Sequence, residues 1–515
     1  MNDLKGALQF KEDSKVIHYW ICQCILILLG LINVYISYFC QVNSNRNIYL
    51  FTSLIVLIYL LNFFLSDGFN GGADSITHFH ISKFSWVHND LFMDQWGKPV
   101  FNILFSPIAQ LGFKAIVITN IILIFFLSWL GYKIAQMLNL KHPHWVAWIY
   151  LLTPIVIGNS ISSLTEPICS LFLVLFIYYG LKNKWIMASI ILGFMPFARS
   201  EGFVIVLLAI IFFLFTSRIK YIPFLLIGTL TFNTIGYILT GLPLWIFESN
   251  PYIHTDITVY GSGPFYHFFM AAIPIFGFVF IILLAETVQW TFWLPKILKS
   301  KEWTLNNQLW FWIILGSFWG YFMAHTVLWW LGMWASLGLL RVMFVICIPM
   351  ALLVVRYLEY LQEKRSYFIS FSAQGVFWLH MVLLPFVIRL FPLEEIKIFP
   401  SKGTEEKIID EFLIEFKKEE SWLDRKLFTG HPYILFKLEK DPFNKDKSAN
   451  LWDWESAVSG DLILWDGHFG PNEHGLTRNS LDSDSSFLFL WETRPDEPFY
   501  TLNQSEFCVR LYEKQ

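Results

Sequence analysis

A succession of long apolar runs constrains the fold of this chain more than any other feature. A helix needs about 20 apolar residues to cross the hydrocarbon core of a bilayer. About twelve runs read as such spans: residues 16–40, 47–65, 114–137, 145–160, 163–180, 185–198, 202–217, 222–245, 264–285, 307–331, 335–355 and 367–390. Charged residues make up only 15% of the chain, whereas soluble domains hold about 25%. We therefore expect an α-helical polytopic membrane protein with about twelve transmembrane helices.

The short loops between these runs differ in charge from one side to the other. One set of loops is basic, with Lys141, Lys182, Lys184, Arg218, Lys220, Lys296, Lys299, Lys301, Arg356, Lys364 and Arg365. The other set is acidic, with Asp67, Asp74, Asp90, Asp94, Glu166, Glu201, Glu248 and Asp256. Cytoplasmic loops carry an excess of Lys and Arg, so the acidic loops and the polar tail are expected outside. The compartment that we expect is the bacterial inner membrane, or the endoplasmic reticulum in a eukaryote.

The sequence divides into a membrane domain, residues 1–391, and a polar tail, residues 392–515. The tail is predicted to be a small extracytoplasmic α+β domain. It opens with an amphipathic helix over 404–420, and strand-like runs follow at 433–438, 462–465, 487–491 and 507–511. The segment 460–475 is rich in Asp, His and Asn. A strand that ends in an Asp-Gly turn is favoured there over a metal or glycan site.

The first outer loop, residues 66–113, concentrates acidic and imidazole side chains. It contains Asp67, Asp74, Asp90 and Asp94 together with His78, His80 and His88. Carboxylates beside a bilayer are costly unless they face water or have a function. Asp74 follows two glycines and opens an amphipathic stretch, where it could cap a helix, act in chemistry, or do both. The loop therefore predicts an enzyme at the membrane surface or a transporter with an acidic mouth.

Four further charges lie at the outer ends of apolar runs. Glu166 follows Thr165, an arrangement that favours a capped helix start. Arg199 and Glu201 flank one serine and could form a local ion pair. Arg341 interrupts an apolar run, where it costs a few kcal/mol, and it could either snorkel to the interface or bind a phosphate.

Taken in order, these segments resemble the GT-C superfamily of polytopic glycosyltransferases. The resemblance covers roughly residues 60–360. Its short motifs are Gly71-Gly72-Ala73-Asp74-Ser75, Asp94-Gln95-Trp96-Gly97-Lys98-Pro99, Leu164-Thr165-Glu166-Pro167, Ala198-Arg199-Ser200-Glu201-Gly202 and Gly338-Leu339-Leu340-Arg341. The chain departs from the family pattern in an extra span before the acidic loop and in the serine after Asp74, where many relatives have Glu.

The resemblance implies inverting transfer of a sugar, most often mannose in the family, from a polyprenyl-phosphate carrier to an acceptor hydroxyl. It implies that Asp74 is the general base and that Asp94 positions the acceptor or a divalent cation. It implies that Arg341 and Arg199 bind the donor phosphate. Further residues would bind or orient substrate: Glu166, Glu201, His78, Trp96 and Asp67. No metal-ligand spacing is present in the sequence.

Two other classes of protein compete with this hypothesis. A transporter or flippase of lipid-linked saccharides would show broken helices and an internal repeat, and the sequence shows no repeat. A structural membrane protein whose tail binds glycans would leave the one-sided carboxylates without a purpose. The expected partners are the polyprenyl-phosphate-linked donor, membrane lipids, and a glycan, lipid or protein acceptor. A net charge of −3 offers no general attraction to nucleic acid.

Overall fold

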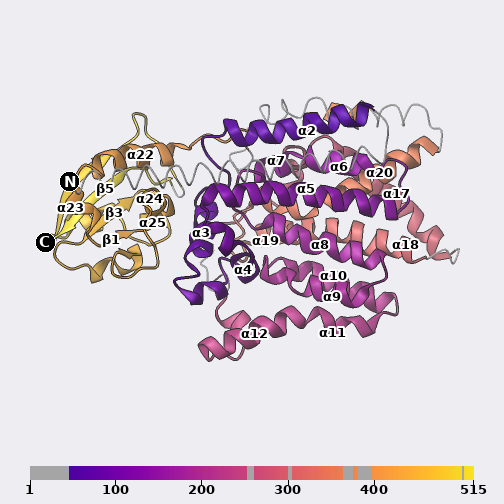
Figure 1. The fold of residues 1–515 in the computed structure, drawn as a ribbon, viewed down its shortest axis with the longest axis horizontal. Helices are drawn as coiled ribbons and strands as arrows, with labels where there is room; N and C mark the ends of the chain where they lie inside the picture. The colour runs from indigo at the N-terminus through magenta and orange to yellow at the C-terminus, as the bar shows by residue number, and fades with distance from the viewer. Residues whose placement is uncertain are drawn as a thin grey trace.

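A computed structural model describes residues 46–251, 260–299, 304–363, 375–377, 379–380, 397–501 and 504–515. A bundle of helices forms one end of the molecule and a small sheet domain forms the other (Figure 1). The principal helices of the bundle are α2 (Arg46–Leu65), α3 (Gly72–Phe84), α4 (Pro99–Ala109), α5 (Phe113–Met137), α6 (Pro143–Leu151), α7 (Pro154–Asn159), α8 (Glu166–Leu181), α9 (Trp185–Gly193), α10 (Gly202–Phe215), α11 (Ile222–Leu225), α12 (Ile227–Thr240), α13 (Trp245–Glu248), α15 (His267–Met270), α16 (Ala272–Phe276), α17 (Val279–Lys299), α18 (Leu305–Gln308), α19 (Gly316–Leu331) and α20 (Cys347–Glu363).

Four described helical segments are both long and apolar enough to cross a membrane. They are Phe113–Met137, Ile219–Thr240, Leu305–Leu331 and Leu340–Glu363. The other apolar helices among the described residues are shorter, so four segments meet these criteria where the sequence predicted about twelve spans. Runs 16–40 and most of 367–390 lie outside the described residues. The apolar helices make the chain an integral membrane protein.

Two expected spans are not continuous helices. The run 145–160 is divided between α6 and α7, because Pro154 begins a new helix after Thr153. The prediction that residues 264–285 form a single span was wrong. This run contains the short helices α15 and α16, which end at Gly277 with φ of 77°. The long helix α17 begins only at Val279, because the left-handed conformation at the glycine stops helical continuation.

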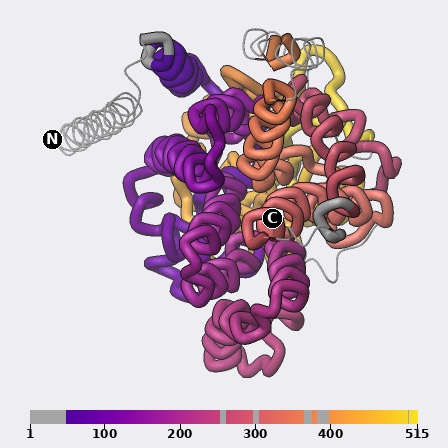
Figure 2. Tube along the Cα trace, turned by 90° about the vertical axis from the view of Figure 1, so that its right-hand side faces the viewer, coloured from indigo at the N-terminus to yellow at the C-terminus, as the bar shows by residue number. Residues whose placement is uncertain are grey.

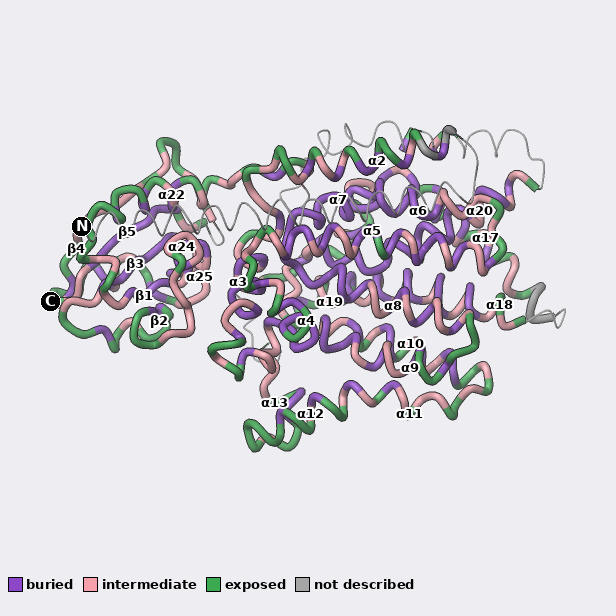
Figure 3. Tube along the Cα trace, in the orientation of Figure 1, coloured by how far each residue is buried: buried purple, intermediate pink, exposed green. Residues whose placement is uncertain are grey.

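Residues of the central helices are mostly buried, whereas the peripheral helices α2 and α12 contain many exposed residues (Figure 3). Viewed from its far end, the bundle has α2 and α12 at opposite rims (Figure 2). The exposed side chains on these two helices include Leu50, Leu54, Leu57, Leu61, Leu230, Ile238 and Leu239. Spacings of three and four residues place such side chains on one helical face. Large exposed apolar faces of this kind suit contact with lipid.

The helical hairpins bring distant loops to the same end of the bundle. Helices α8 and α10 both begin at the end nearest the sheet domain (Figure 1). The first turn of α8 contains Glu166, and α10 begins directly after Arg199 and Glu201. At the opposite end, Lys141 and Glu363 form an ion pair of 3.0 Å. The acidic and basic loop sets are thus separated along the helix axes.

The tail folds into a five-stranded mixed sheet with the order β2-β1-β3-β5-β4. Its strands are β1 (Leu427–Thr429), β2 (Ser448–Ala449), β3 (Leu462–Asp466), β4 (Phe487–Thr493) and β5 (Val509–Lys514). Strand β1 is parallel to both β2 and β3, with Leu427 opposite Leu462, whereas β5 is antiparallel to β3 and β4. Five α-helices accompany the sheet in the described part of the tail: α22 (Thr404–Phe416), α23 (Glu420–Leu423), α24 (Pro432–Lys437), α25 (Phe469–Asn472) and α26 (Arg478–Ser483).

The tail agrees with the sequence analysis except at one expected strand. The amphipathic helix is present as α22, and its apolar side chains Ile408, Ile409, Phe412, Leu413 and Phe416 are all buried. The expected strand at 433–438 was wrong, because these residues form helix α24 (Pro432–Lys437). Proline at the first helical position favours a helix start, and the His431 ring accepts a hydrogen bond from the amide of Tyr433.

Several contacts attach the tail to the acidic loop. The amide of Gly68 donates to the carbonyl of Pro400 at 2.9 Å, and the amide side chain of Asn70 donates to the carbonyl of Lys397 at 2.9 Å. His88 and Asp441 form a further contact of 2.8 Å. A β-carbon on Gly68 would lie 2.5 Å from the backbone of Ser401. Glycine therefore permits the close approach that holds the sheet domain over this end of the bundle.

Candidate active site

Asp74 lies in the first turn of α3, at the end of the bundle that faces the tail. The helix begins after Gly71, which has φ of 84° and occupies the N-cap position without any side-chain cap. Asp74 therefore does not cap the helix. Its carboxylate forms an ion pair with Arg341 instead, and the side chain remains 39% exposed.

An ion-pair network links Asp74 to three other segments of the chain. Glu166 Oε1 lies 3.5 Å from Arg341 Nε and accepts a hydrogen bond of 2.8 Å from Arg199 Nη1. Arg199 Nη2 donates to Glu201 Oε1 at 2.7 Å. The local ion pair expected around Ser200 is therefore present, but it is one part of a larger arrangement. We call these five residues the ion network.

Burial increases from Asp74 toward the interior of the ion network. The Glu166 side chain is inaccessible, and those of Arg341 and Arg199 are 11% and 13% exposed. Thr165 precedes α8 as its N-cap residue but makes no side-chain cap, since its hydroxyl accepts from Arg199 at 3.1 Å. Glu166 Oε2 and Arg199 Nε have no hydrogen-bond partner in the described part of the chain. Buried polar atoms without partners call for a water or a ligand.

Lys98 is a third cation of the site, and the sequence analysis did not single it out. It is buried, and its ammonium donates to Ser200 Oγ at 3.3 Å and to the carbonyl of Gln95 at 2.9 Å. Burial lowers the pKa of Lys98 to about 8, opposed by the attraction of nearby Glu201. The sequence signal for Lys98 was its position between a glycine and a proline in a loop rich in acidic residues.

His78 and Trp96 lie beside Lys98. The two rings stack with centroids 4.7 Å apart. Burial, followed by the positive charges of Lys98, Arg199 and Arg341, lowers the pKa of His78 well below its usual range. A neutral imidazole can both donate and accept hydrogen bonds, so His78 is suited to contact hydroxyl groups.

The two remaining predicted residues lie outside the ion network. The carboxylate of Asp94 accepts a hydrogen bond of 2.5 Å from the amide of Gly97. Burial raises the pKa of Asp94, although that hydrogen bond and the charge of Lys98 oppose the shift. Asp94 therefore contacts the site through the backbone that positions Lys98. Asp67 is exposed and takes part in none of the ion pairs of the network.

Helix α19 contributes two aromatic side chains that sequence reasoning missed. Tyr321 and His325 are buried one helical turn apart, with ring centroids 4.6 Å apart. Both lie within electrostatic range of Arg199 and Glu201. Among the described residues, neither Tyr321 Oη nor His325 Nε2 finds a hydrogen-bond partner. Their spacing of four residues was a weak signal, since a run of aromatic residues in an apolar helix usually reports packing alone.

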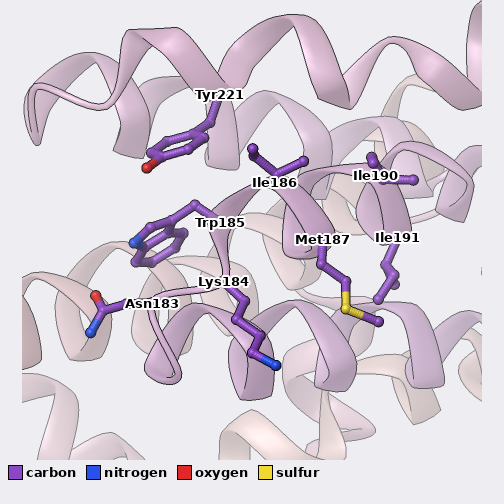
Figure 4. Close-up of a pocket in the computed structure, with 8 residues that line it drawn as sticks. All are labelled: Asn183, Lys184, Trp185, Ile186, Met187, Ile190, Ile191 and Tyr221. Carbon is purple, nitrogen blue, oxygen red and sulfur yellow. The ribbon is translucent and has the colours of Figure 1, made fainter.

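A surface pocket around Trp185 and Tyr221 lies away from these residues (Figure 4). It occupies the start of α9, and Arg199 follows the other end of that helix. The helical stretch continues to Phe197, and a rise of 1.5 Å per residue separates the ends of this stretch by about 18 Å. The pocket is therefore not part of the ion network. Within the described residues, no group of three or more His, Cys, Asp or Glu side chains is arranged to hold a metal ion.

The fold defines the class of protein to which this structure is similar. This fold is similar to the fold of the GT-C glycosyltransferases, so the resemblance inferred from the sequence is confirmed at the level of the fold. Among the solved structures that it matches are two of ArnT from Cupriavidus metallidurans. The form bound to undecaprenyl phosphate has a TM-score of 0.50 at 9% identity, over 91% of this chain and 98% of that chain. The apo form has a TM-score of 0.51 at 9% identity, over 90% and 97%. No protein-family model and no curated protein matches the sequence.

Proposed function

We propose that the chain is a glycosyltransferase that moves a sugar from a polyprenyl-phosphate carrier to an acceptor hydroxyl. The observation that supports this most is the ion network, in which a half-exposed Asp74 adjoins buried Arg341 and Arg199. Chemistry of this kind needs a base and a set of cations in one place. The similarity in fold to a structure that contains undecaprenyl phosphate supports the same class of donor.

The cations would bind the donor phosphate. Arg341, Arg199 and Lys98 are all buried or nearly so, and guanidinium groups favour phosphate through paired hydrogen bonds. As the bond from the anomeric carbon to the phosphate oxygen breaks, negative charge grows on the phosphate. Fixed cations in a site of low polarity stabilise that charge. Phosphate is a good leaving group, so no strong general acid is required.

Asp74 would be the base for the acceptor hydroxyl. In the structure its carboxylate is held by Arg341, and a donor phosphate would compete for the same guanidinium. Donor binding would thereby release Asp74 to accept the proton while the hydroxyl oxygen attacks the anomeric carbon from the face opposite the phosphate. The product sugar would have inverted configuration. Asp94 would position this site through Gly97 and Lys98, and Glu166 and Glu201 would hold the two arginines in place.

The experiment is Asp74→Asn in the purified full-length protein, assayed with a panel of polyprenyl-phosphate sugars. Loss of a general base slows transfer by about 10²–10⁴-fold. Asp90→Asn is the matched control, because Asp90 is an exposed carboxylate of the same loop outside the ion network, and it should retain full activity. Binding of undecaprenyl phosphate, followed by native mass spectrometry, should persist in both variants. An Asp74→Asn protein that transfers sugar at the wild-type rate would exclude Asp74 as the base. Vesicle flipping without any transfer would indicate a flippase instead.

A further inference from the structure

The sheet domain holds a second polar cluster, at the edge where β1 and β3 end. These two strands are parallel, so the residues that follow them meet at one edge. Ligands bind preferentially outside the carboxyl ends of parallel strands. Here β1 ends at Thr429 and is followed by His431, and β3 ends at Asp466 and is followed by His468. We call this set, together with Glu405 of α22, the edge cluster.

Hydrogen bonds between side chains organise the edge cluster. Glu405 contacts His468 Nδ1 at 2.9 Å and His431 Nε2 at 3.3 Å, so one carboxylate joins the two imidazoles. Asp466 Oδ1 accepts from the amides of His468 and Phe469 at 2.9 and 2.7 Å. Glu405 and His468 are each about one-fifth exposed, at 22% and 23%. The cluster is therefore rigid at its base and accessible at its rim.

Two buried polar atoms of the edge cluster have no partner. Asp466 is fully buried and Thr429 is 4% exposed, yet neither Asp466 Oδ2 nor Thr429 Oγ1 makes a hydrogen bond to any residue that the structure describes. The Asp466 carboxylate also lies within electrostatic range of His468 and His474. A buried carboxylate oxygen without a partner costs stability. A ligand that brings hydroxyl groups would supply donors to this oxygen and acceptors to the threonine hydroxyl.

A series of contacts leads from the edge cluster toward the helix that contains Asp74. Glu473 follows α25 directly and accepts a hydrogen bond of 3.0 Å from Tyr260 Oη. Tyr260 in turn lies within electrostatic range of Asp74. Helix α24, which follows His431, packs on α3, which contains Asp74. A molecule seated on the edge cluster would therefore lie on the side of the sheet domain that packs on α3.

The charges of this region favour an uncharged ligand. Glu405, Asp466 and Glu473 are carboxylates, and the ion pairs that the structure shows for Glu405 are made with histidines. The neighbouring lysines Lys402 and Lys437 are both paired with Asp410. Phosphorylated ligands are recognised by available Arg or Lys side chains. Carboxylate and imidazole groups suit the hydroxyls of a neutral sugar.

We propose that the edge cluster is the acceptor subsite, and that the acceptor is a neutral, hydroxyl-rich glycan rather than a phosphorylated one. This inference rests on the proposed function, because it assigns the second substrate of the same reaction. Glu405 and His468 would contact the glycan at the rim. Asp466 and Thr429 would contact hydroxyls that enter deeper. Glu473 and Tyr260 would guide the reacting hydroxyl toward Asp74.

The test uses the full-length protein in detergent on an array of neutral, phosphorylated and uronic-acid glycans. We expect retention on neutral glycans. Asp466→Asn and Thr429→Val keep the shape of each side chain, and each should weaken that retention about tenfold, as expected when hydrogen bonds to a buried group are lost. Asp453→Asn, at an exposed carboxylate of the same domain, is the matched control and should bind as the wild type does. His468→Gln, at the rim, gives a further variant that is less demanding for folding.

Each outcome bears on the inference separately from the proposed function. Retention only on charged glycans, no retention at all, or wild-type retention by the folded variants would overturn the acceptor subsite. Binding of undecaprenyl phosphate should be the same in the wild type, Asp466→Asn and Thr429→Val, because the edge cluster lies in the sheet domain. If the wild type neither binds that lipid nor transfers sugar, the proposed function fails, whatever the array shows.

Discussion

Glu166 is the residue whose removal should disturb the ion network most. Its side chain is inaccessible, and its Oε1 atom lies 2.8 Å from Arg199 and 3.5 Å from Arg341. Removing one partner of a buried ion pair costs about 3–5 kcal/mol. In Glu166→Gln each guanidinium keeps one carboxylate, since Arg199 retains Glu201 and Arg341 retains Asp74. We therefore expect the lower end, a loss of about 3 kcal/mol in the free energy of unfolding.

Glu201→Gln is the matched control for this prediction. Glu201 is 20% exposed and contacts only one guanidinium of the ion network, at 2.7 Å, so we expect a loss of about 1 kcal/mol. The free energy of unfolding can be followed by tryptophan fluorescence in mixed micelles of rising SDS content, since the chain has 23 Trp. If Glu166→Gln is no less stable than Glu201→Gln, the stabilisation that we attribute to the burial of Glu166 and to its contacts with two guanidinium groups is refuted.

Two further predictions concern the acidic loop and the edge cluster. Gly71→Ala should destabilise the protein more than Gly72→Ala does. Both glycines have a positive φ, 84° and 48°, which costs alanine about 1 kcal/mol at either position, but only at Gly71 would a β-carbon also lie 2.7 Å from Leu164; equal thermal midpoints would contradict this. His468→Gln should flatten the fall in thermal midpoint as the pH rises above about 6.5. Burial is the largest single effect and lowers the pKa of His468, but the hydrogen bond and charge of Glu405, together with the charges of Asp466 and Glu473, raise it above its ordinary value. This stabilisation is therefore complete below about pH 6.5, the ordinary value for His, and is lost as the pH rises through the folded pKa; an unchanged pH profile would refute it.

Sequence patterns predicted the elements whose signals are local. Helices α5 and α19 follow from long apolar runs, and α22 follows from the spacing of Ile408, Ile409 and Phe412. The expected strand at 433–438 failed because a short apolar run fits a helix or a strand equally well. The expected span over 264–285 failed because one glycine conformation ends a helix that composition alone would continue.

The residues of the candidate site also divide into those that the sequence indicated and those that only the structure shows. Asp74, Glu166, Arg199, Glu201 and Arg341 were singled out from the sequence, since charged residues beside a membrane are costly. Lys98, Tyr321 and His325 were missed, because a lysine in a loop and aromatic residues in an apolar helix are ordinary features of such a chain. Only burial and proximity to the ion network distinguish them.

The sequence by itself determined that the chain enters a membrane, that its acids and bases alternate between two ends of the helices, and that a polar domain follows. These properties depend on composition and periodicity, which are local along the chain. Tertiary structure alone decided that Asp74 and Arg341, which are 267 positions apart, form an ion pair with Glu166 behind them. It also brought Glu405, His431 and His468 together in the edge cluster. Contacts between residues so far apart in the sequence depend on how helices pack and where a glycine permits close approach, and no local sequence pattern indicates them.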